Sequence, residues 1–120
     1  MAKKAPAGRG GAEGAGKSDR PVPRGGSVAI RTGFYEGFEL PLDRDWFVIG
    51  RGRTADMVIA EATISRAHAA VGYDDEGFYV QDLGSTNGTL VNGAKVERHA
   101  LKVGDEIQIG RLVVEVTLPV

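Results

Sequence analysis

Short apolar runs separated by closely spaced turn signals are the feature that most limits how this chain can fold. In most of these runs apolar and polar residues alternate, which is typical of strands with one buried face. The expected strands are 28–31, 38–42, 46–49, 78–81, 106–109 and 112–118, and the expected turns are 74–77, 87–88, 92–93 and 104–105. The run 46–49 is continuously apolar, which predicts a strand covered on both faces. Many short strands with hairpin-type turns predict an all-β fold, an antiparallel sandwich.

The alanine-rich segment 54–71 fits this pattern less well. Thr54 is able to cap a helix, and helix propensity alone leaves the segment undecided. The β-branched pair Val58-Ile59 and the run Thr63-Ile64-Ser65 favour a short strand, a loop and then a second strand.

Residues 1–27 differ from the rest in composition. They are rich in Gly, Ala, Pro and Lys/Arg, contain no aromatic residue, and carry six basic and two acidic residues, a charge of +4. The remaining residues carry nine basic and fourteen acidic ones, a charge of −5. Such a segment cannot bury enough apolar surface to order itself, so we expect a disordered basic tail over 1–27 and one domain over 28–120. A solubilising leader or linker is the simplest role for this tail, and contact with nucleic acid or an acidic partner is the alternative.

The residue inventory excludes several kinds of chemistry. Cysteine is absent, so disulfides, thiol nucleophiles and Cys-based zinc sites are excluded, and two histidines, His68 and His99, make a metal site improbable. We expect no cofactor, and we expect His99 in a surface loop. No apolar run approaches the roughly 18 residues that a membrane span needs. The chain is therefore expected to be cytoplasmic.

Two catalytic patterns occur by spacing alone. Residues 50–55 fit G-x-G-x-x-A, and Asp74 lies where a ribose-binding acid is expected, so a dinucleotide-binding enzyme is one hypothesis. That fingerprint needs a strand–helix–strand unit, which the rest of the sequence does not suggest. Ser65 and His68 are three residues apart, but Ser65 is not in a G-x-S-x-G context. We therefore expect no enzyme.

The expected loops carry an unusual concentration of anion-binding groups. Arg51, Arg53 and Arg66 fall in loops that flank strands, although the domain as a whole is acidic. Ser65, Thr86 and a carboxamide at Asn87 lie in the same set of loops. Guanidinium groups and hydroxyls together match the oxygens of a phosphate. Each residue alone is explained by ordinary turn chemistry, but together they predict an anion pocket.

These residues resemble the forkhead-associated (FHA) domain family. The resemblance rests on five motifs, which are Gly50-Arg51, Ser65 to His68, Leu83 to Thr89, Asn92-Gly93 and Leu101 to Gly110. It covers residues 28–118, nearly the whole expected domain. It implies a sandwich of about eleven mostly antiparallel strands that binds phosphothreonine peptides through loops at one end. Such a module is non-catalytic and serves Ser/Thr kinase signalling, with a kinase or its substrate as partner. A phospho-independent scaffold or oligomerisation domain is the alternative.

The resemblance also assigns a role to each motif residue. By position, Arg51 contacts the phosphate, Ser65 and Thr86 supply hydroxyls, Arg66 adds a further contact, and Asn87 holds the peptide backbone. Gly50, His68 and Gly88 support the loops. The residue three positions after the phosphothreonine is expected to be read near Arg53, Thr63 and Ile64. Some small FHA proteins have a phosphorylated tail threonine that folds back on the pocket, and Ser18 and Ser27 are the only hydroxyl residues of this tail. We therefore expect no such switch.

Overall fold

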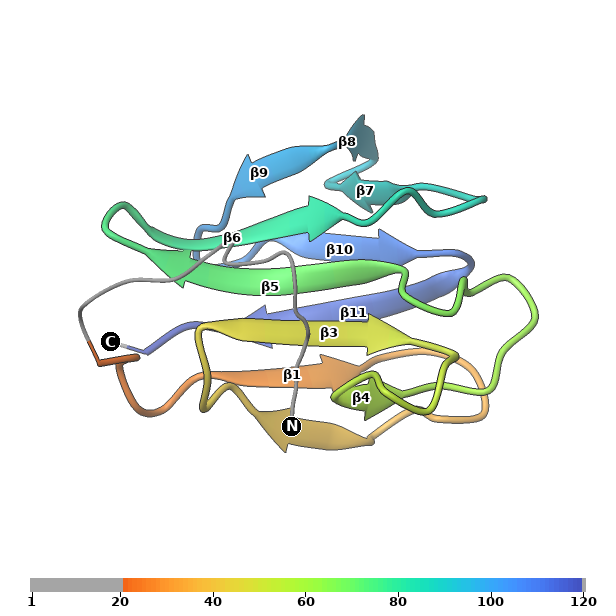
Figure 1. Cartoon of the computed structure of the whole chain (residues 1–120), viewed down its shortest axis with the longest axis horizontal. Helices are drawn as coiled ribbons and strands as arrows, with labels where there is room; N and C mark the ends of the chain where they lie inside the picture. Colours follow the sequence, from red (N-terminus) through yellow and green to blue (C-terminus); the bar gives the residue numbers. More distant parts are fainter. Residues whose placement is uncertain (1–20, 120) are drawn as a thin grey trace.

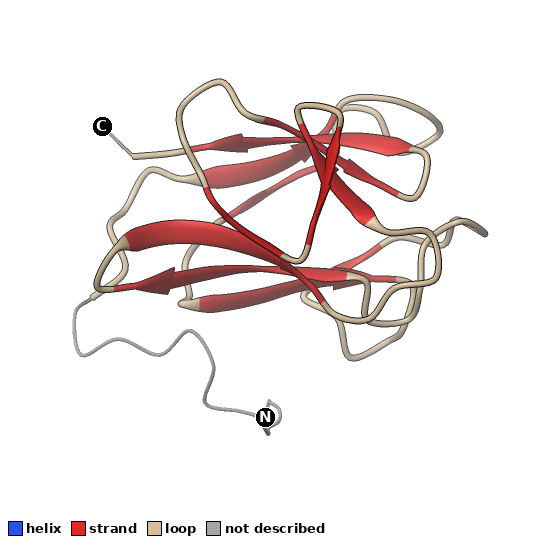
Figure 2. Cartoon of the chain, turned by 90° about the horizontal axis from the view of Figure 1, so that it is seen from above, coloured by secondary structure: helices blue, strands red, loops and turns tan. Residues whose placement is uncertain are grey.

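The computed structural model describes residues 21–119, which form eleven strands and no helix. The strands are β1 (Ser27–Ile30), β2 (Glu39–Pro41), β3 (Trp46–Gly50), β4 (Met57–Val58), β5 (Ala69–Asp74), β6 (Gly77–Asp82), β7 (Thr89–Val91), β8 (Ala94–Val96), β9 (Arg98–Ala100), β10 (Glu106–Ile109) and β11 (Leu112–Thr117). They form two sheets, in the orders β2-β1-β11-β10-β7-β8 and β4-β3-β5-β6-β9 (Figure 1). Figure 2 shows the sheets as two packed layers. The expected all-β sandwich is confirmed, with β3 and β4 as a parallel pair.

The alternation in the sequence defines the core between the layers. In β11, Leu112, Val114 and Val116 are buried, while Glu115 and Thr117 face solvent. The other strands contribute inward residues in the same way, and each fully buried aliphatic side chain contributes about 1.5–3 kcal/mol relative to exposure. The core therefore fixes the register of the strands, and through it the positions of the loops at their ends.

Two expectations about single strands are wrong. Phe47 and Ile49 of β3 are buried, but Trp46 and Val48 are only half-buried, so this strand is not covered on both faces. A two-layer sandwich has no third layer to cover outward-facing residues. His99, expected in a loop, lies in β9, where it pairs with Val80 of β6.

The alanine-rich segment contains the expected short strand, loop and second strand, but the run Thr63-Ile64-Ser65 that favoured a strand lies in the loop. The two-residue β4 pairs with the end of β3, and β5 begins at Ala69. Between them, Ile59 and Ile64 are buried. These two side chains anchor the connection in the core and leave its polar residues on the surface.

The packed part of the chain begins before Val28. Val22 packs against the core, and the Gly26 carbonyl accepts a hydrogen bond from the Leu42 backbone N–H at 2.9 Å. Strand β1 starts at Ser27. Residues 21–27, which the sequence analysis assigned to the tail, are therefore part of the packed body, because β1 pairs with both β2 and β11 from its first residue. The expected disorder of residues 1–20 lies outside the described residues.

A glycine on the outer face of the second sheet is covered by a tyrosine ring. Gly72 of β5 pairs with Tyr79 of β6, and a Cβ added at Gly72 would lie 2.3 Å from the Tyr79 Cζ. The Arg98 guanidinium lies over the other side of the ring, 3.6 Å from its centroid. The ring is therefore clamped between a strand backbone and a cation.

We expect Gly72→Ala to lower the free energy of unfolding by about 1–3 kcal/mol, because the new methyl group forces the clamped ring to move. Urea denaturation measures this cost. In the double variant Gly72→Ala/Tyr79→Ala the obstructing ring is gone, so the added cost of the alanine at 72 should fall to a few tenths of a kcal/mol. Equal costs in the two backgrounds would contradict the steric explanation.

Candidate functional site

The expected site residues lie in three connections at one end of the sandwich. These connections join β3 to β4, β4 to β5, and β6 to β7, and all three lie at the right in Figure 1. The β1–β2 and β10–β11 connections lie at the same end. Loops carried by a rigid sandwich hold side chains in place without movement of the sheets.

Arg51 follows the last residue of β3 and is exposed. Its backbone N–H donates to the Ser65 carbonyl at 2.9 Å, and its side-chain Nε donates to the Ile64 carbonyl at 2.9 Å. The second bond orients the guanidinium group along the β4–β5 connection. Within residues 21–119, no other hydrogen bond is made by this side chain, so its two Nη groups remain for a ligand.

Gly50 lets these two connections approach each other. A Cβ at this position would lie 2.1 Å from the Arg66 carbonyl oxygen. The same oxygen accepts a hydrogen bond from the Gly52 N–H at 3.0 Å. The glycine is needed for close backbone approach, since its own φ is not in the left-handed region. The Arg66 side chain itself is exposed.

Ser65 connects the β4–β5 and β6–β7 loops. Its Oγ accepts a hydrogen bond from the Thr86 backbone N–H at 3.0 Å. Because this bond uses a lone pair, the hydroxyl proton of Ser65 is left to donate outward. The Thr86 side chain is exposed beside it. Hydrogen bonds thus link the three connections that carry Arg51, Ser65 and Thr86.

Asn87 is exposed and is oriented by a residue of another loop. Its Nδ2 donates to the Thr63 carbonyl at 2.8 Å, which leaves the carboxamide oxygen and one N–H for a ligand. The Thr63 hydroxyl donates to Glu61 and accepts from the Arg111 backbone N–H at 3.0 Å. Glu61 also pairs with the Arg111 Nε at 3.2 Å. Hydrogen bonds from Thr63, together with Arg111, hold the pKa of Glu61 below its usual value.

His68 is fully buried behind these loops. The Ser65 backbone N–H donates to its Nδ1 at 3.1 Å, and its Nε2 lies 2.8 Å from the Gly88 carbonyl. With an acceptor at Nδ1 and a donor at Nε2, the ring is the neutral tautomer protonated at Nε2. It links the loop of Ser65 to the loop of Asn87. Gly88 has a φ of 87°, a conformation that favours glycine.

Asp82, at the end of β6, organises the β6–β7 loop. One carboxylate oxygen accepts from the backbone N–H groups of Gly84 and Ser85, both at 3.0 Å. The other accepts from the Ser85 hydroxyl at 2.5 Å and the Thr89 hydroxyl at 2.8 Å. Burial alone would raise the pKa of Asp82, but these bonds outweigh it and hold the pKa below its usual value. The sequence analysis missed this residue, although the Asp-x-x-Ser spacing is a known turn signal.

We expect Asp82→Asn to destabilise the protein by about 1–3 kcal/mol, because a neutral carboxamide with one oxygen replaces a carboxylate whose two oxygens accept four charge-assisted hydrogen bonds. Phosphopeptide affinity should fall as well, since the loop of Thr86 and Asn87 loses its anchor. Thermal unfolding and peptide titration measure the two effects. Glu76→Gln, in the exposed β5–β6 turn, is the control and should change neither.

The depressed pKa of Asp82 sets the direction of the pH dependence. Its contribution to stability is fully present above the pKa that an aspartate has in the unfolded chain, and it is lost as the pH falls through the lower folded value. Acid destabilisation between these two values should therefore be smaller in Asp82→Asn than in the parent protein. Identical acid profiles would contradict this role.

Neither catalytic pattern survives in the structure. Residues 50–55 lead into a turn and then β4, so among residues 21–119 the glycine pattern does not open a helix. His68 accepts a hydrogen bond from the Ser65 backbone and not from its hydroxyl, so it is not placed as a base for that serine. Within the described part of the chain, no cluster of His, Cys, Asp or Glu is arranged to hold a metal ion. That part also contains no helix long and apolar enough to cross a membrane.

Comparison with known protein families identifies this arrangement. The FHA domain profile matches residues 47–110, just over half of the chain. The chain belongs to the FHA domain family. The matched region holds all three connections that carry the expected site residues, so the FHA resemblance seen in the sequence is confirmed.

Relatives of this FHA domain are regulators. It is 34% identical to the oxoglutarate dehydrogenase inhibitor of Corynebacterium diphtheriae, over 92% of this chain and 78% of the relative. It is 36% identical to the glycogen accumulation regulator GarA of Mycolicibacterium smegmatis, over 84% of this chain and 65% of the relative. The chain thus spans slightly less than two thirds of GarA.

Solved FHA domains have the same architecture. One, from a study of phosphothreonine-dependent FHA interactions, superimposes with a TM-score of 0.71 at 31% identity, over 79% of this chain and 98% of that one. The FhaA FHA domain, in complex with the intracellular domain of Rv3910, gives 0.70 at 31% identity, over 78% of this chain and 100% of that one.

Proposed function

We propose that this FHA domain is a non-catalytic module that binds phosphothreonine peptides in Ser/Thr kinase signalling. Its partner is a phosphothreonine-containing protein, either a Ser/Thr kinase or a kinase substrate, and it acts in the cytoplasm. The proposal is supported by the phosphothreonine dependence of a similar solved domain and by the regulatory relatives. Since part of each relative lies beyond the match, the metabolic targets that their names state are not transferred to this chain.

One observation carries the proposal, the hydrogen bond between the Ser65 hydroxyl and the Thr86 backbone beside the oriented guanidinium of Arg51. A phosphothreonine carries about −1.5 to −2 charges and three acceptor oxygens. The site offers donors to match, in the two Nη groups of Arg51 and the hydroxyl proton of Ser65. The exposed side chains of Arg51, Arg53 and Arg66 add positive charge to this end of an acidic domain.

Each site residue has a distinct role in this proposal. Arg51 grips two phosphate oxygens through its Nη groups, and the hydroxyls of Ser65 and Thr86 donate to the phosphate. Arg66 adds charge at the edge of the site. Asn87 bonds the peptide backbone next to the phosphothreonine, so that the extended peptide has one register. Gly50, His68 and Gly88 hold the loops in the geometry that these contacts need.

Titration of the full chain with one peptide in four forms tests the function. The forms carry phosphothreonine, threonine, phosphoserine or glutamate at the same position. We expect phosphothreonine to bind most tightly and phosphoserine about fivefold more weakly, since it lacks a methyl group worth roughly 1 kcal/mol, and we expect no measurable binding of the threonine and glutamate forms. Equal binding of the phosphorylated and unphosphorylated forms would instead support the phospho-independent scaffold.

A further inference from the structure

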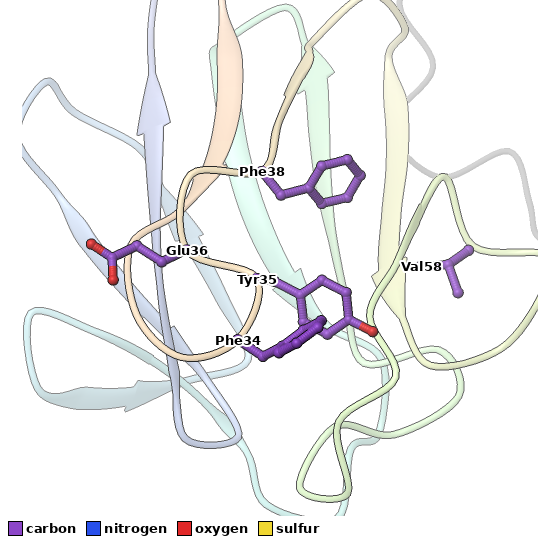
Figure 3. A pocket seen from close by; sticks show the side chains of 5 residues that line it. All are labelled: Phe34, Tyr35, Glu36, Phe38 and Val58. Carbon is purple, nitrogen blue, oxygen red and sulfur yellow. The ribbon is translucent and has the colours of Figure 1, made fainter.

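An aromatic pocket lies between the β1–β2 connection and the edge strand β4. Phe34, Tyr35, Glu36, Phe38 and Val58 line it, and its volume is about 340 Å³. Figure 3 shows Tyr35, Phe38 and Val58 around the opening and the Glu36 carboxylate directed away from them. The side chains around the opening are therefore uncharged and mostly apolar. We call these five residues the aromatic pocket.

Most of the apolar side chains of the aromatic pocket are exposed to solvent. Among residues 21–119, four large hydrophobic residues are exposed, and three of them, Phe34, Phe38 and Val58, belong to the aromatic pocket. Phe34 is 94% exposed, and its ring meets Tyr35 edge to face at 5.3 Å. Single exposed apolar residues are ordinary, but a contiguous cluster of aromatic residues marks an interaction surface.

A hydrogen bond links the aromatic pocket to the connection that carries Ser65. The Tyr35 hydroxyl accepts a hydrogen bond from the Ala60 backbone N–H at 3.2 Å. Ala60 belongs to the same β4–β5 connection as Ser65, five residues earlier in the chain. Five residues span at most about 17 Å even when fully extended. An extended peptide held at Ser65 therefore reaches the pocket within about four to six of its own residues.

We propose that the aromatic pocket binds a large apolar side chain of the same phosphoprotein whose phosphothreonine occupies the loop site. This inference rests on the proposed function and adds a second determinant of partner choice. The apolar residue lies about four to six positions from the phosphothreonine in an extended segment. The link to the β4–β5 connection favours this occupant over the chain's own first 20 residues, because Met1 is the one large apolar side chain that those residues contain.

Phosphopeptide scanning tests the proposal. A phosphothreonine peptide in a serine–glycine background receives a single leucine, moved position by position on both sides of the phosphothreonine. Affinities are measured for the full chain and for the variants Phe34→Ser and Val58→Thr, which change exposed side chains and should leave the fold intact. Val103→Ser is the matched control, since Val103 is 79% exposed but lies in the β9–β10 connection at the other end of the sandwich (Figure 1).

The expected result is that leucine at one or two positions raises affinity about tenfold, the effect of burying an apolar side chain. This gain should persist in Val103→Ser and disappear in Phe34→Ser and Val58→Thr, while the peptide without leucine binds all four proteins equally. A gain that survives both pocket variants, or no gain at any position, would overturn the inference but leave the proposed function standing. If no phosphothreonine peptide binds, both this inference and the proposed function are wrong. A dimer of the parent protein that Phe34→Ser dissociates in sedimentation would assign the pocket to a second copy instead.

Discussion

Phosphopeptide affinity should fall about a hundredfold or more when Arg51 is replaced by alanine. The side chain is exposed, and its Nε bond to the Ile64 carbonyl holds the guanidinium group beside the connection that carries Ser65. Truncating one partner of a desolvated, charge-assisted hydrogen-bonded pair typically costs about 2–5 kcal/mol, or about 30- to 5,000-fold in affinity, and loss of both Nη donors places Arg51→Ala above the lower end of this range. Isothermal titration with the phosphothreonine peptide measures it.

Two further variants separate the geometry of Arg51 from its charge. Arg51→Lys keeps the charge but loses the planar fork, so most of the affinity should still be lost. Arg53→Ala removes a charge from the same connection and should reduce affinity only severalfold. In Arg51→Ala, loss of the single bond to Ile64 should cost about 1 kcal/mol of stability and leave unfolding cooperative. Loss of the cooperative transition would mean that Arg51 serves the fold and not the ligand.

A large loss of stability is expected for Gly50→Ala. The new Cβ would lie 2.1 Å from the Arg66 carbonyl oxygen, and this neighbour is backbone, which cannot rotate away as a side chain does. The β3–β4 and β4–β5 connections would have to separate, with strain on the hydrogen bonds from Arg51 to Ser65 and from Gly52 to Arg66. We expect a cost of about 3 kcal/mol, measured by chemical denaturation, together with loss of phosphopeptide binding.

Gly52→Ala is the matched control for this prediction. Its Cβ would lie 3.1 Å from the same carbonyl oxygen, a contact that a small shift relieves. Its cost should therefore be well under half of that at Gly50. Similar costs at the two positions would show that loss of glycine flexibility dominates and that the close approach at Gly50 does not matter.

Features set by local chemistry were predictable from the sequence. Period-two alternation identified β1, β2, β6, β10 and β11, and the Asn92-Gly93 pair forms the expected turn between β7 and β8, with φ values of 51° and 87°. The Asn92 side chain also does more than turn the chain. It donates to Asp105 and accepts from the Glu106 N–H, which ties this hairpin to the start of β10.

Features that depend on contacts between distant segments were not predictable. Asn87 is oriented by Thr63, and Thr63 by Arg111, across three connections whose proximity only the packed sandwich creates. The aromatic pocket is of the same kind. The sequence analysis assigned Phe38 to a strand with an apolar face. In the structure β2 begins at Glu39, and Phe38 lines a pocket together with Val58 of β4, the edge strand of the other sheet. The alternation of apolar and polar residues within one segment does not indicate which distant segment its side chains will contact.

The ends of the described chain lie away from the binding loops. Pro119 packs beside Gly25 and Gly26, at the left in Figure 1, whereas Arg51, Ser65 and Thr86 belong to connections at the right. A label or a bead attached just beyond Pro119 would therefore start at the opposite end of the sandwich from these three connections. We therefore expect protein immobilised through its C-terminal end to bind phosphopeptides as well as protein free in solution.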